Sequence, residues 1–443
     1  MTEKILTRNF HLPDSHTLRV YRETGGYQAL PKAFAMEPSA DTDEVKRSNL
    51  RGLGGAGFPA GVKWGFVPKG RTAPVYLVIN ADEGEPGTFK DRYILEKDPH
   101  ALIEGMIIAG YAIDSHSSFV YIRGEYVQPW RIFSSAVREA YEAGFLGRNI
   151  LGSGFDFDIV IHRGAGAYIC GEETGLISSL EGKKGWPKVK PPFPAIKGAF
   201  GSPTIVNNVE TIAHVPHIIN RGAEWFASLG TKTQGGTRIY SLSGHVNRPG
   251  IYETSVSVTL RELIYEQSGG IPNGRKLKAV VPGGSSAAIL TADEIDVVMD
   301  VDGLRNAGSM AGSAGVIVMD ETVSIPEALM VVARFYAHES CGQCTPCRES
   351  TGWIYKMTRR IVEGKGRTQD LDTILDVAKR GAGTTICAFY DGAVGPYISY
   401  IEKFRPEFEA LVGERKERLG AGVAISSGAG TGWAPGLSPR PTL

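Results

Sequence analysis

The chain has 443 residues, enough for about three domains that each bury a hydrophobic core. Lysine plus arginine and aspartate plus glutamate number 48 each, so the formal net charge is zero. No basic block stands out, and we therefore predict no nucleic-acid partner, because binding a phosphate backbone requires clustered positive charge.

The first ten residues have neither an apolar signal core nor the Arg/Ser-rich pattern of a transit peptide, so we expect no export. A polar helix is predicted over about 43–50, and the segment from Gly52 to Gly61 that follows is rich in glycine. Closely spaced glycines let backbone amides approach a phosphate, and Lys63 can add a point charge. A tight surface turn explains the same pattern. Because a helix precedes these glycines, the pattern also departs from the dinucleotide-binding fingerprint.

Three apolar runs, 75–80, 118–123 and 157–162, alternate with the helix-length segments 98–112 and 129–143. This alternation predicts an α/β domain with a largely parallel sheet. The apolar runs, including 316–319 further on, are too short to span a bilayer, so we expect no direct insertion into a membrane.

Two acidic, glycine-rich loops follow the first and third of these runs. The first loop contains Asn80, Asp82, Glu83 and Glu85, and the second spans 163–175. Because the carboxyl ends of parallel strands meet at one edge of a sheet, we expect the loops to share a crevice. Their acidic and amide groups suit the hydroxyls and ring edge of a flavin or nucleotide. Solvated acidic turns are the alternative interpretation.

The segment 182–203 is rich in glycine and proline and is predicted to be a loop or covering arm, followed by a helix over 207–220. Short strands at 238–243, 250–254 and 278–282, with a helix at 259–268, predict a small α+β module. Helices dominate from residue 325 onward, at 326–338, 349–363, 371–379 and 394–405. We predict domains at 1–236, 237–325 and 326–419, and a disordered tail at 420–443.

Four of the five cysteines have the spacing of an iron–sulfur site, namely Cys341, Cys344, Cys347 and Cys387. A C-x-x-C-x-x-C turn can place three thiolates on three corners of a cubane, with the fourth supplied by the fold. The alternative is a structural zinc site, which usually draws its cysteines as two separated pairs. Cys170 stands apart, and we assign it no ligand role. Few cysteines in ligand spacing suit a reducing compartment.

Several motifs together resemble the NADH-binding flavoprotein subunit of respiratory complex I. They are Gly-Leu-Gly-Gly-Ala-Gly-Phe-Pro, Asn-Ala-Asp-Glu-Gly-Glu-Pro-Gly-Thr, Gly-Ala-Gly-Ala-Tyr-Ile-Cys-Gly-Glu-Glu-Thr, Pro-Pro-Phe-Pro, Val-Asn-Asn-Val-Glu-Thr and Glu-Ser-Cys-Gly-Gln-Cys-Thr-Pro-Cys-Arg. The match covers about residues 20–415. It implies a Rossmann-like flavin domain, a β-grasp module that resembles soluble-ligand-binding domains, and a C-terminal four-helix region with one [4Fe–4S] cluster.

Carried over by position, the resemblance implies contacts with the cofactors FMN and NADH. At the flavin phosphate and NADH it places Gly52, Gly54, Gly55 and Lys63, and on FMN it places Asn80, Asp82, Glu83, Tyr168, Gly171, Glu172, Asn207 and Asn208. It implies that Phe58, Phe66 and Phe193 stack on adenine and that Glu85 and Glu173 contact the nicotinamide nucleotide. It adds Gly57, Gly61, Gly164, Gly166, Thr174, Lys190 and Thr211 to the cofactor pocket. The chain departs from the family pattern at Ser350 and at Phe389-Tyr390.

The same resemblance implies hydride transfer from NADH to FMN, then single-electron transfer to the cluster, with no side chain acting as acid or base. The implied partners are a thioredoxin-like [2Fe–2S] subunit and a large iron–sulfur subunit of the peripheral arm. We therefore expect a cytoplasmic chain held at the inner face of the cell membrane through its complex. Two alternatives remain open: the flavin subunit of a soluble NAD-linked hydrogenase or formate dehydrogenase, and a zinc-stapled binding module built on the β-grasp segment.

Overall fold

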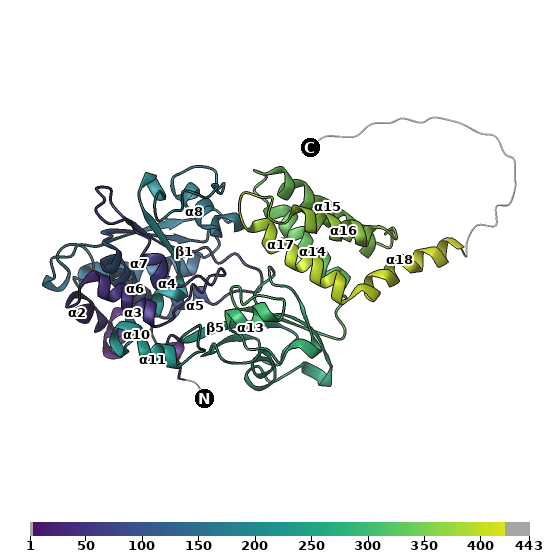
Figure 1. Ribbon diagram of the computed structural model, residues 1–443. Helices are drawn as coiled ribbons and strands as arrows, with labels where there is room; N and C mark the ends of the chain where they lie inside the picture. Colours follow the sequence, from purple (N-terminus) through teal and green to yellow (C-terminus); the bar gives the residue numbers. More distant parts are fainter. Residues whose placement is uncertain (1–2, 421–443) are drawn as a thin grey trace, which may run out of the picture.

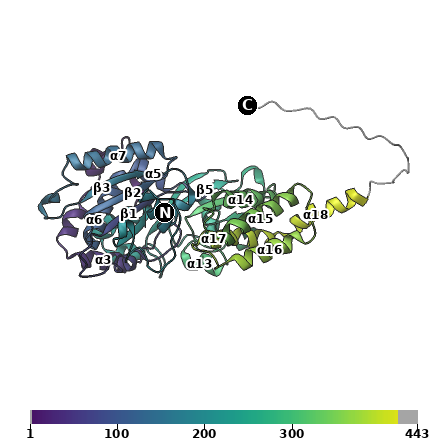
Figure 2. The ribbon, with the colours of Figure 1, turned by 90° about the horizontal axis from the view of Figure 1, so that it is seen from above.

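The computed structural model describes residues 3–420, so the predicted tail lies outside the described residues except for Gly420. Figure 1 shows a part built around a parallel sheet, a second part with a mixed sheet, and a helical bundle at the C-terminal side. Seen from above in Figure 2, the parallel sheet and the bundle lie at opposite ends of an elongated body.

The first sheet has four strands, all parallel, in the order β3-β2-β1-β4. They are β1 (Tyr76–Ala81), β2 (Ser117–Ile122), β3 (Asp158–Arg163) and β4 (Thr204–Asn208). The predicted parallel sheet is confirmed, but β4 was not predicted. Asn207 and Asn208 belong to this strand, so the predicted helix over 207–220 begins two residues too early. The segment instead continues as α9 (Val209–Ala213) and α10 (Val215–Arg221).

The strand order creates a switch point at β1, where the chain connections leave toward opposite edges of the sheet. From β1 the chain continues to β2 on one side, whereas β4 pairs with β1 on the other side. In open parallel sheets, ligands bind outside the carboxyl ends of the strands at such a point. The residues at these ends are Asn80 and Ala81 in β1 and Asn207 and Asn208 in β4.

The helix α6 (Pro99–Ile113) is buried along almost its whole length. The side chain of Asp98 caps its first turn by accepting from the Ala101 amide, 3.3 Å away. The buried carboxylate of Glu104 accepts hydrogen bonds from Tyr21 Oη and from the amides of Tyr27 and Ala29. These bonds attach the N-terminal segment to α6.

The remaining helices of this part surround α6 and the sheet. They are α1 (Leu18–Glu23), α2 (Ala29–Phe34), α3 (Pro38–Arg47), α4 (Ala60–Trp64), α5 (Asp91–Lys97), α7 (Val127–Glu142), α8 (Glu173–Leu180) and α11 (Ala223–Ser228). The predicted polar helix is α3, which begins and ends earlier than expected. Between α8 and β4 the described chain has no regular helix or strand other than the short 3₁₀ turn 199–201, as predicted for the arm.

The mixed sheet has five strands in the order β6-β5-β9-β7-β8. They are β5 (Thr237–Gly244), β6 (Gly250–Ser255), β7 (Leu277–Val281), β8 (Leu290–Thr291) and β9 (Gly315–Asp320). The central strand β9 pairs parallel to β5 and antiparallel to β7. The predicted helix is shorter than expected: α12 (Leu260–Glu262) passes into a π-helical turn over 263–267. A further helix, α13 (Val301–Asn306), precedes β9.

Up to residue 420, the C-terminal part contains five helices: α14 (Ile325–Glu339), α15 (Thr345–Val362), α16 (Asp370–Gly381), α17 (Phe389–Lys403) and α18 (Arg405–Gly420). Within residues 3–420, no helix is long and apolar enough to cross a membrane. One hydrophobic core, which we call the bridging core, joins this bundle to the parallel sheet. It runs from Val78 in β1 through Ile169 to Tyr336 and Ile354 in the bundle.

In the part built around the parallel sheet, the buried carboxylate of Asp41 on α3 makes the stability depend on pH. Neither oxygen of Asp41 has a hydrogen-bond partner among the described residues, and burial, with repulsion from Glu44, raises its pKa to about 7. A raised folded-state pKa favours folding while the group is protonated, and this advantage is lost as the pH rises through about 7.

We predict that Asp41→Asn removes this pH dependence. Between pH 5 and pH 8 the wild type should lose about 1–2 kcal/mol of stability relative to the variant, measured as the difference in thermal unfolding midpoints. Asp43→Asn, at an exposed position of the same helix, is the matched control and should behave as the wild type. Parallel pH profiles for the wild type and Asp41→Asn would contradict the prediction.

Candidate functional site

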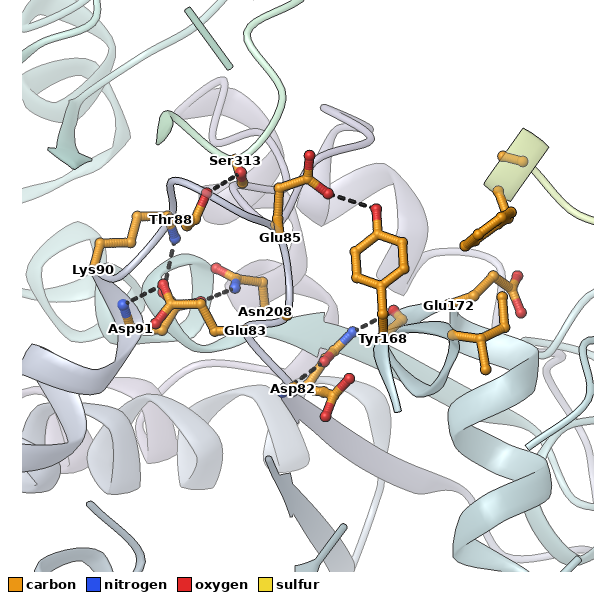
Figure 3. A pocket seen from close by; sticks show the side chains of 17 residues that line it. Asp82, Glu83, Glu85, Thr88, Lys90, Asp91, Tyr168, Glu172, Asn208 and Ser313 are labelled. Atoms are coloured by element: carbon orange, nitrogen blue, oxygen red, sulfur yellow. Dashed lines mark hydrogen bonds and ion pairs between the residues drawn. The ribbon is translucent and has the colours of Figure 1, made fainter. Parts of the chain in front are cut away.

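A cavity of about 230 Å³ opens at the carboxyl ends of β1 and β4. Most of its lining comes from the loop after β1 and from the 3₁₀ turn Tyr168–Gly171, and Figure 3 shows how these side chains lie. The mixed sheet contributes Ser313, and the helical bundle contributes Ala388 and Phe389. We call this space the switch-point cavity. All three parts of the chain therefore meet at one site.

The two predicted loops do share this crevice. The side chain of Asn80 accepts from the Asp82 amide at 3.0 Å and donates to the carbonyl of Gly171 at 2.8 Å. Asp82 is buried, and its Oδ2 atom has no hydrogen-bond partner among the described residues. Burial raises the pKa of Asp82 to about 7, although nearby Arg123 opposes the shift. A buried, unpartnered acceptor that lines a cavity suits a ligand with a hydrogen-bond donor.

Glu83 borders the cavity, but its carboxylate binds the protein itself. It accepts from the amides of Asp91 and Arg92 at 2.8 and 3.2 Å, at the first turn of α5, and from Tyr126 Oη at 2.7 Å. Burial raises the pKa of Glu83 to about 7; Asp91 adds to the shift and Lys90 opposes it. Glu83 therefore fixes the position of the loop relative to α5.

A buried charge cluster behind the loop was not predicted from the sequence. Lys90 is fully buried, and its Nζ atom lies 2.7 Å from both Asp91 Oδ1 and Glu210 Oε2. Asn208 Nδ2 donates to Asp91 Oδ2 at 2.6 Å, so β4 joins the same cluster, as the dashed lines in Figure 3 show. Burial would lower the pKa of Lys90, but Asp91, Glu210 and Glu83 outweigh it and raise the pKa to about 12. Lys90 therefore remains charged inside the protein.

Glu85 links the loop to the mixed sheet. Its carboxylate accepts from Tyr168 Oη at 2.5 Å and from the amide and hydroxyl of Ser286, both at 2.7 Å. Burial, followed by the charge of Glu85, raises the pKa of Tyr168 well above its ordinary value. The ring of Tyr168 lines the cavity, and its hydroxyl is held by this bond.

The mixed sheet also holds the glycine-rich segment. Arg238 in β5 is buried and donates to the carbonyls of Leu53 and Ala311, both at 3.3 Å, and to the carbonyl of Gly312. Thr211 Oγ1 accepts from the Leu53 amide at 2.9 Å. Leu53 is therefore fixed from two sides, which holds the neighbouring Gly54 at the cavity.

Among the predicted glycines, Gly54 and Gly171 line the cavity. A Cβ at Gly54 would lie 2.9 Å from the Cβ of Asn208, so only glycine fits there. Gly57 and Gly166 have positive φ angles of 66° and 84°. The remaining predicted glycines, at 52, 55, 61 and 164, do not line the cavity. Asn207 also lies outside it, because its side chain accepts from Trp64 Nε1.

Beside the cavity, two lysines surround one glutamate. Lys63 Nζ lies 3.2 Å from Glu173 Oε2, and Lys190 on the arm binds the other oxygen of Glu173 at 2.5 Å. Burial alone would raise the pKa of Glu173, but the two lysines more than offset it and the pKa falls below its ordinary value. Glu172 lies within 3.5 Å of Lys190 and accepts from the amide of Thr174 at the start of α8.

The three predicted stacking aromatics are exposed. Phe58 and Phe66 lie together, with ring centroids 5.9 Å apart and about half of each side chain accessible to solvent. Phe193 is exposed on the arm, 57%, and makes no ring contact with the other two. Exposed phenylalanines of this kind offer faces on which a planar base can stack.

The four predicted cysteines line a second cavity, which we call the cysteine cavity. Its other lining residues are Ile169, Ser340, Gln343, Thr385, Phe389 and Tyr390. Cys344 occupies the N-cap position of α15, Cys347 lies in the first turn of that helix, and Cys387 precedes α17. Helix N-termini favour thiolates, whereas burial raises the pKa of Cys347 to about 12 and that of Cys387 to about 11. A positively charged metal centre would offset this cost of burial.

Positions that depart from the family pattern, and one residue of the arm, adjoin the cysteine cavity. Ser350 and Tyr390, two of the positions that depart from the family pattern, lie in α15 and α17, and Tyr390 lines the cavity. Trp186 on the arm donates from Nε1 to the carbonyl of Cys341 at 3.2 Å. Cys170 does not line the cavity, in keeping with its position in the sequence.

Comparisons with known proteins agree with this architecture. The Nuo51 FMN-binding domain matches residues 45–217, the SLBB domain matches 238–318, and the NADH-ubiquinone oxidoreductase-F iron-sulfur binding region matches 327–411. Fold and sites together define an iron–sulfur flavoprotein. The F 2 subunit of the NADH-quinone oxidoreductase of Rhizobium meliloti (strain 1021) is 52% identical over 94% of this chain and 99% of its own length. The chain belongs to the family of NADH-quinone oxidoreductase F subunits.

Other similar proteins support the same family assignment. The F subunits of the NADH-quinone oxidoreductases of Mycobacterium tuberculosis (strain H37Rv) and Streptomyces coelicolor are 51% and 50% identical, over 92% and 95% of this chain and 93% and 92% of their own lengths. Among solved structures, an NAD+-reducing [NiFe]-hydrogenase in the H2-reduced state matches with a TM-score of 0.80 and 34% identity. That match covers 89% of this chain and 67% of the hydrogenase chain.

The buried charge cluster gives a direct test of the site. We predict that Lys90→Met destabilises the protein by about 3–5 kcal/mol, because Asp91 and Glu210 are left buried without a cation. The measurement is the thermal unfolding midpoint. Lys97→Met, at the exposed last position of α5, the helix that follows Lys90, is the control and should change the midpoint little. Equal midpoints for the two variants would mean that the cluster does not stabilise the cavity.

Proposed function

We propose that this chain oxidises NADH as the flavoprotein subunit of a respiratory NADH:quinone oxidoreductase. Electrons pass from NADH to FMN in the switch-point cavity, then singly to a [4Fe–4S] cluster in the cysteine cavity, and on to partner subunits. The observation that supports this most strongly is the adjacency of the two cavities. Ile169 and Phe389 line both of them, so the two sites lie on either side of the same side chains.

The residues of the switch-point cavity fit FMN. The unpartnered Asp82 oxygen can accept from a polar group of the cofactor, and Gly54 and Gly171 leave space where a side chain would intrude. We propose that Asn80, Asp82, Tyr168, Glu172 and Asn208 complete the pocket. When bound, FMN accepts two electrons as a hydride and releases them one at a time. The residues around the cavity would orient NADH against it, because hydride transfer requires the two reacting groups to be held in contact.

Aromatic and charged side chains outside the switch-point cavity are the proposed binding site of NADH. We propose that Phe58, Phe66 and Phe193 stack on the adenine, and that Lys63 and Lys190 lie near its phosphates. In the described structure both lysines are ion-paired with Glu173, which follows the cavity-lining Glu172 in the sequence. Glu85 and Glu173 are the carboxylates proposed to contact the nicotinamide nucleotide.

The cysteine cavity fits a cubane better than a zinc ion. Three of its thiols come from one compact turn and the fourth from the start of another helix, and a cubane binds each thiolate at a separate iron. Among residues 3–420, no three His, Cys, Asp or Glu side chains converge on a single ion. The thiols instead border a cavity in common.

The ligand set is tested by two cysteine variants. Cys387→Ala should abolish the electron paramagnetic resonance (EPR) signal of the reduced cluster, whereas Cys170→Ala should retain it. In both variants NADH should still bleach the flavin absorbance under anaerobic conditions, because hydride transfer needs only FMN and NADH held together. A signal that survives in Cys387→Ala and disappears in Cys170→Ala would exclude this ligand set.

The partners distinguish the proposal from its nearest rival, a flavin subunit of a soluble hydrogenase or formate dehydrogenase. We propose that the chain binds a thioredoxin-like [2Fe–2S] subunit and a large iron–sulfur subunit, and through them associates with the inner face of the cell membrane. The identity of about 50% to F subunits of NADH-quinone oxidoreductases exceeds the 34% to the hydrogenase chain and favours this assignment.

Affinity purification of the tagged chain from its native membranes tests this assignment. After gentle detergent extraction we expect quinone-reducing membrane subunits to co-purify, because permanent interfaces of this kind bury more than about 2,000 Å². Recovery with hydrogenase or formate dehydrogenase subunits alone would overturn the respiratory assignment. Untagged cells provide the control for nonspecific recovery.

A further inference from the structure

A single layer of apolar side chains separates the two cavities. Ile169 and Phe389 line both cavities, Cys387 lines only the cysteine cavity, and Ala388 lines only the switch-point cavity. Within three consecutive residues, 387–389, the chain thus passes from one cavity to the other. The opposing side of the wall comes from the 3₁₀ turn Tyr168–Gly171.

The wall is held rigidly. Phe389 is 8% exposed, and its ring packs edge-on against Tyr168 and Tyr336, with centroid distances of 5.7 and 5.6 Å. Ile169 is 7% exposed and belongs to the bridging core. Neither side chain carries a polar atom, so the layer offers water no hydrogen-bonding partner.

The two faces of this wall differ strongly in polarity. On the side of the switch-point cavity lie carboxylates, among them Asp82, Glu85 and Glu172. On the other side lie the four thiols. The reduction potential of an iron–sulfur cluster depends on its exposure to solvent and on the hydrogen bonds to its sulfurs. Reduction adds negative charge, which water stabilises, so water that reached the cluster would raise its potential.

We propose that Phe389 and Ile169 form an apolar partition that keeps the water of the switch-point cavity away from the cluster and thereby holds its reduction potential low. Both are positioning residues: they exchange no proton or electron with the ligands and act by excluding solvent. This inference rests on the proposed flavin and cluster sites.

The side chain of Phe389 can be tested apart from its backbone. A substitution at Phe389 removes only the ring and keeps the main-chain N–H, which lies two residues after Cys387. Phe335 provides a matched control. Its ring packs against the same Tyr168 at 5.1 Å, yet it lines neither cavity.

The experiment compares holoprotein variants by two readouts of the reduced cluster. One is its midpoint potential from an EPR-monitored redox titration, and the other is the deuterium modulation of the EPR echo after exchange into D₂O. For Phe389→Ala and Ile169→Ala we expect stronger modulation and about a tenfold shift of the one-electron equilibrium toward reduction, a rise of about 59 mV. Phe389→Leu, which refills the wall, and Phe335→Ala should match the wild type.

Each outcome decides the question. Wild-type potential and modulation in both Phe389→Ala and Ile169→Ala would overturn the partition, and so would an equal shift in Phe335→Ala, because the effect would then come from general loosening. If Phe389→Ala fails to retain its cluster, Ile169→Ala tests the same wall from the other side. If the wild type itself gives no cluster signal, the proposed function fails rather than the partition.

Discussion

The site depends on one buried cation. Lys90 holds together two carboxylates that belong to different connections: Asp91 begins α5 after β1, and Glu210 lies in α9 after β4. These are the connections that diverge at the switch point. Glu210 also accepts from the amide of Ile239 in β5 at 2.7 Å, which extends the cluster to the mixed sheet. Without Lys90, two negative charges would face each other in an environment that water does not reach.

The mixed sheet also holds residues of the site in place. Its Ser286 fixes Glu85, its Arg238 fixes Leu53, and its Ser313 bonds Thr88 in the cavity wall at 2.5 Å. The module therefore sets the shape of a cavity whose residues come mostly from another sheet, although it contributes only one lining residue.

The sequence predicted those features that neighbouring residues determine by themselves. The apolar runs of β1, β2 and β3 and the spacing of Cys341, Cys344 and Cys347 were readable because neighbouring residues alone encode them. The strand β4 was not, since five residues after Pro203 become a strand only by pairing with β1. Lys90 resembled any charged residue, because its burial depends on Glu210, 120 positions away in the sequence. Likewise, nothing in the sequence indicated that Glu83 and Glu85 bind the protein itself.

The bridging core has a consequence for motion. Because buried side chains pack without a break from Val78 in β1 to Ile354 in α15, the parallel sheet and the bundle have no flexible joint between them within residues 3–420. Domains that close around ligands rotate about a few residues with sparse packing, and the described part of this chain has no such seam between its two cavities. A flavin and a cluster held in the two cavities would therefore keep a fixed separation.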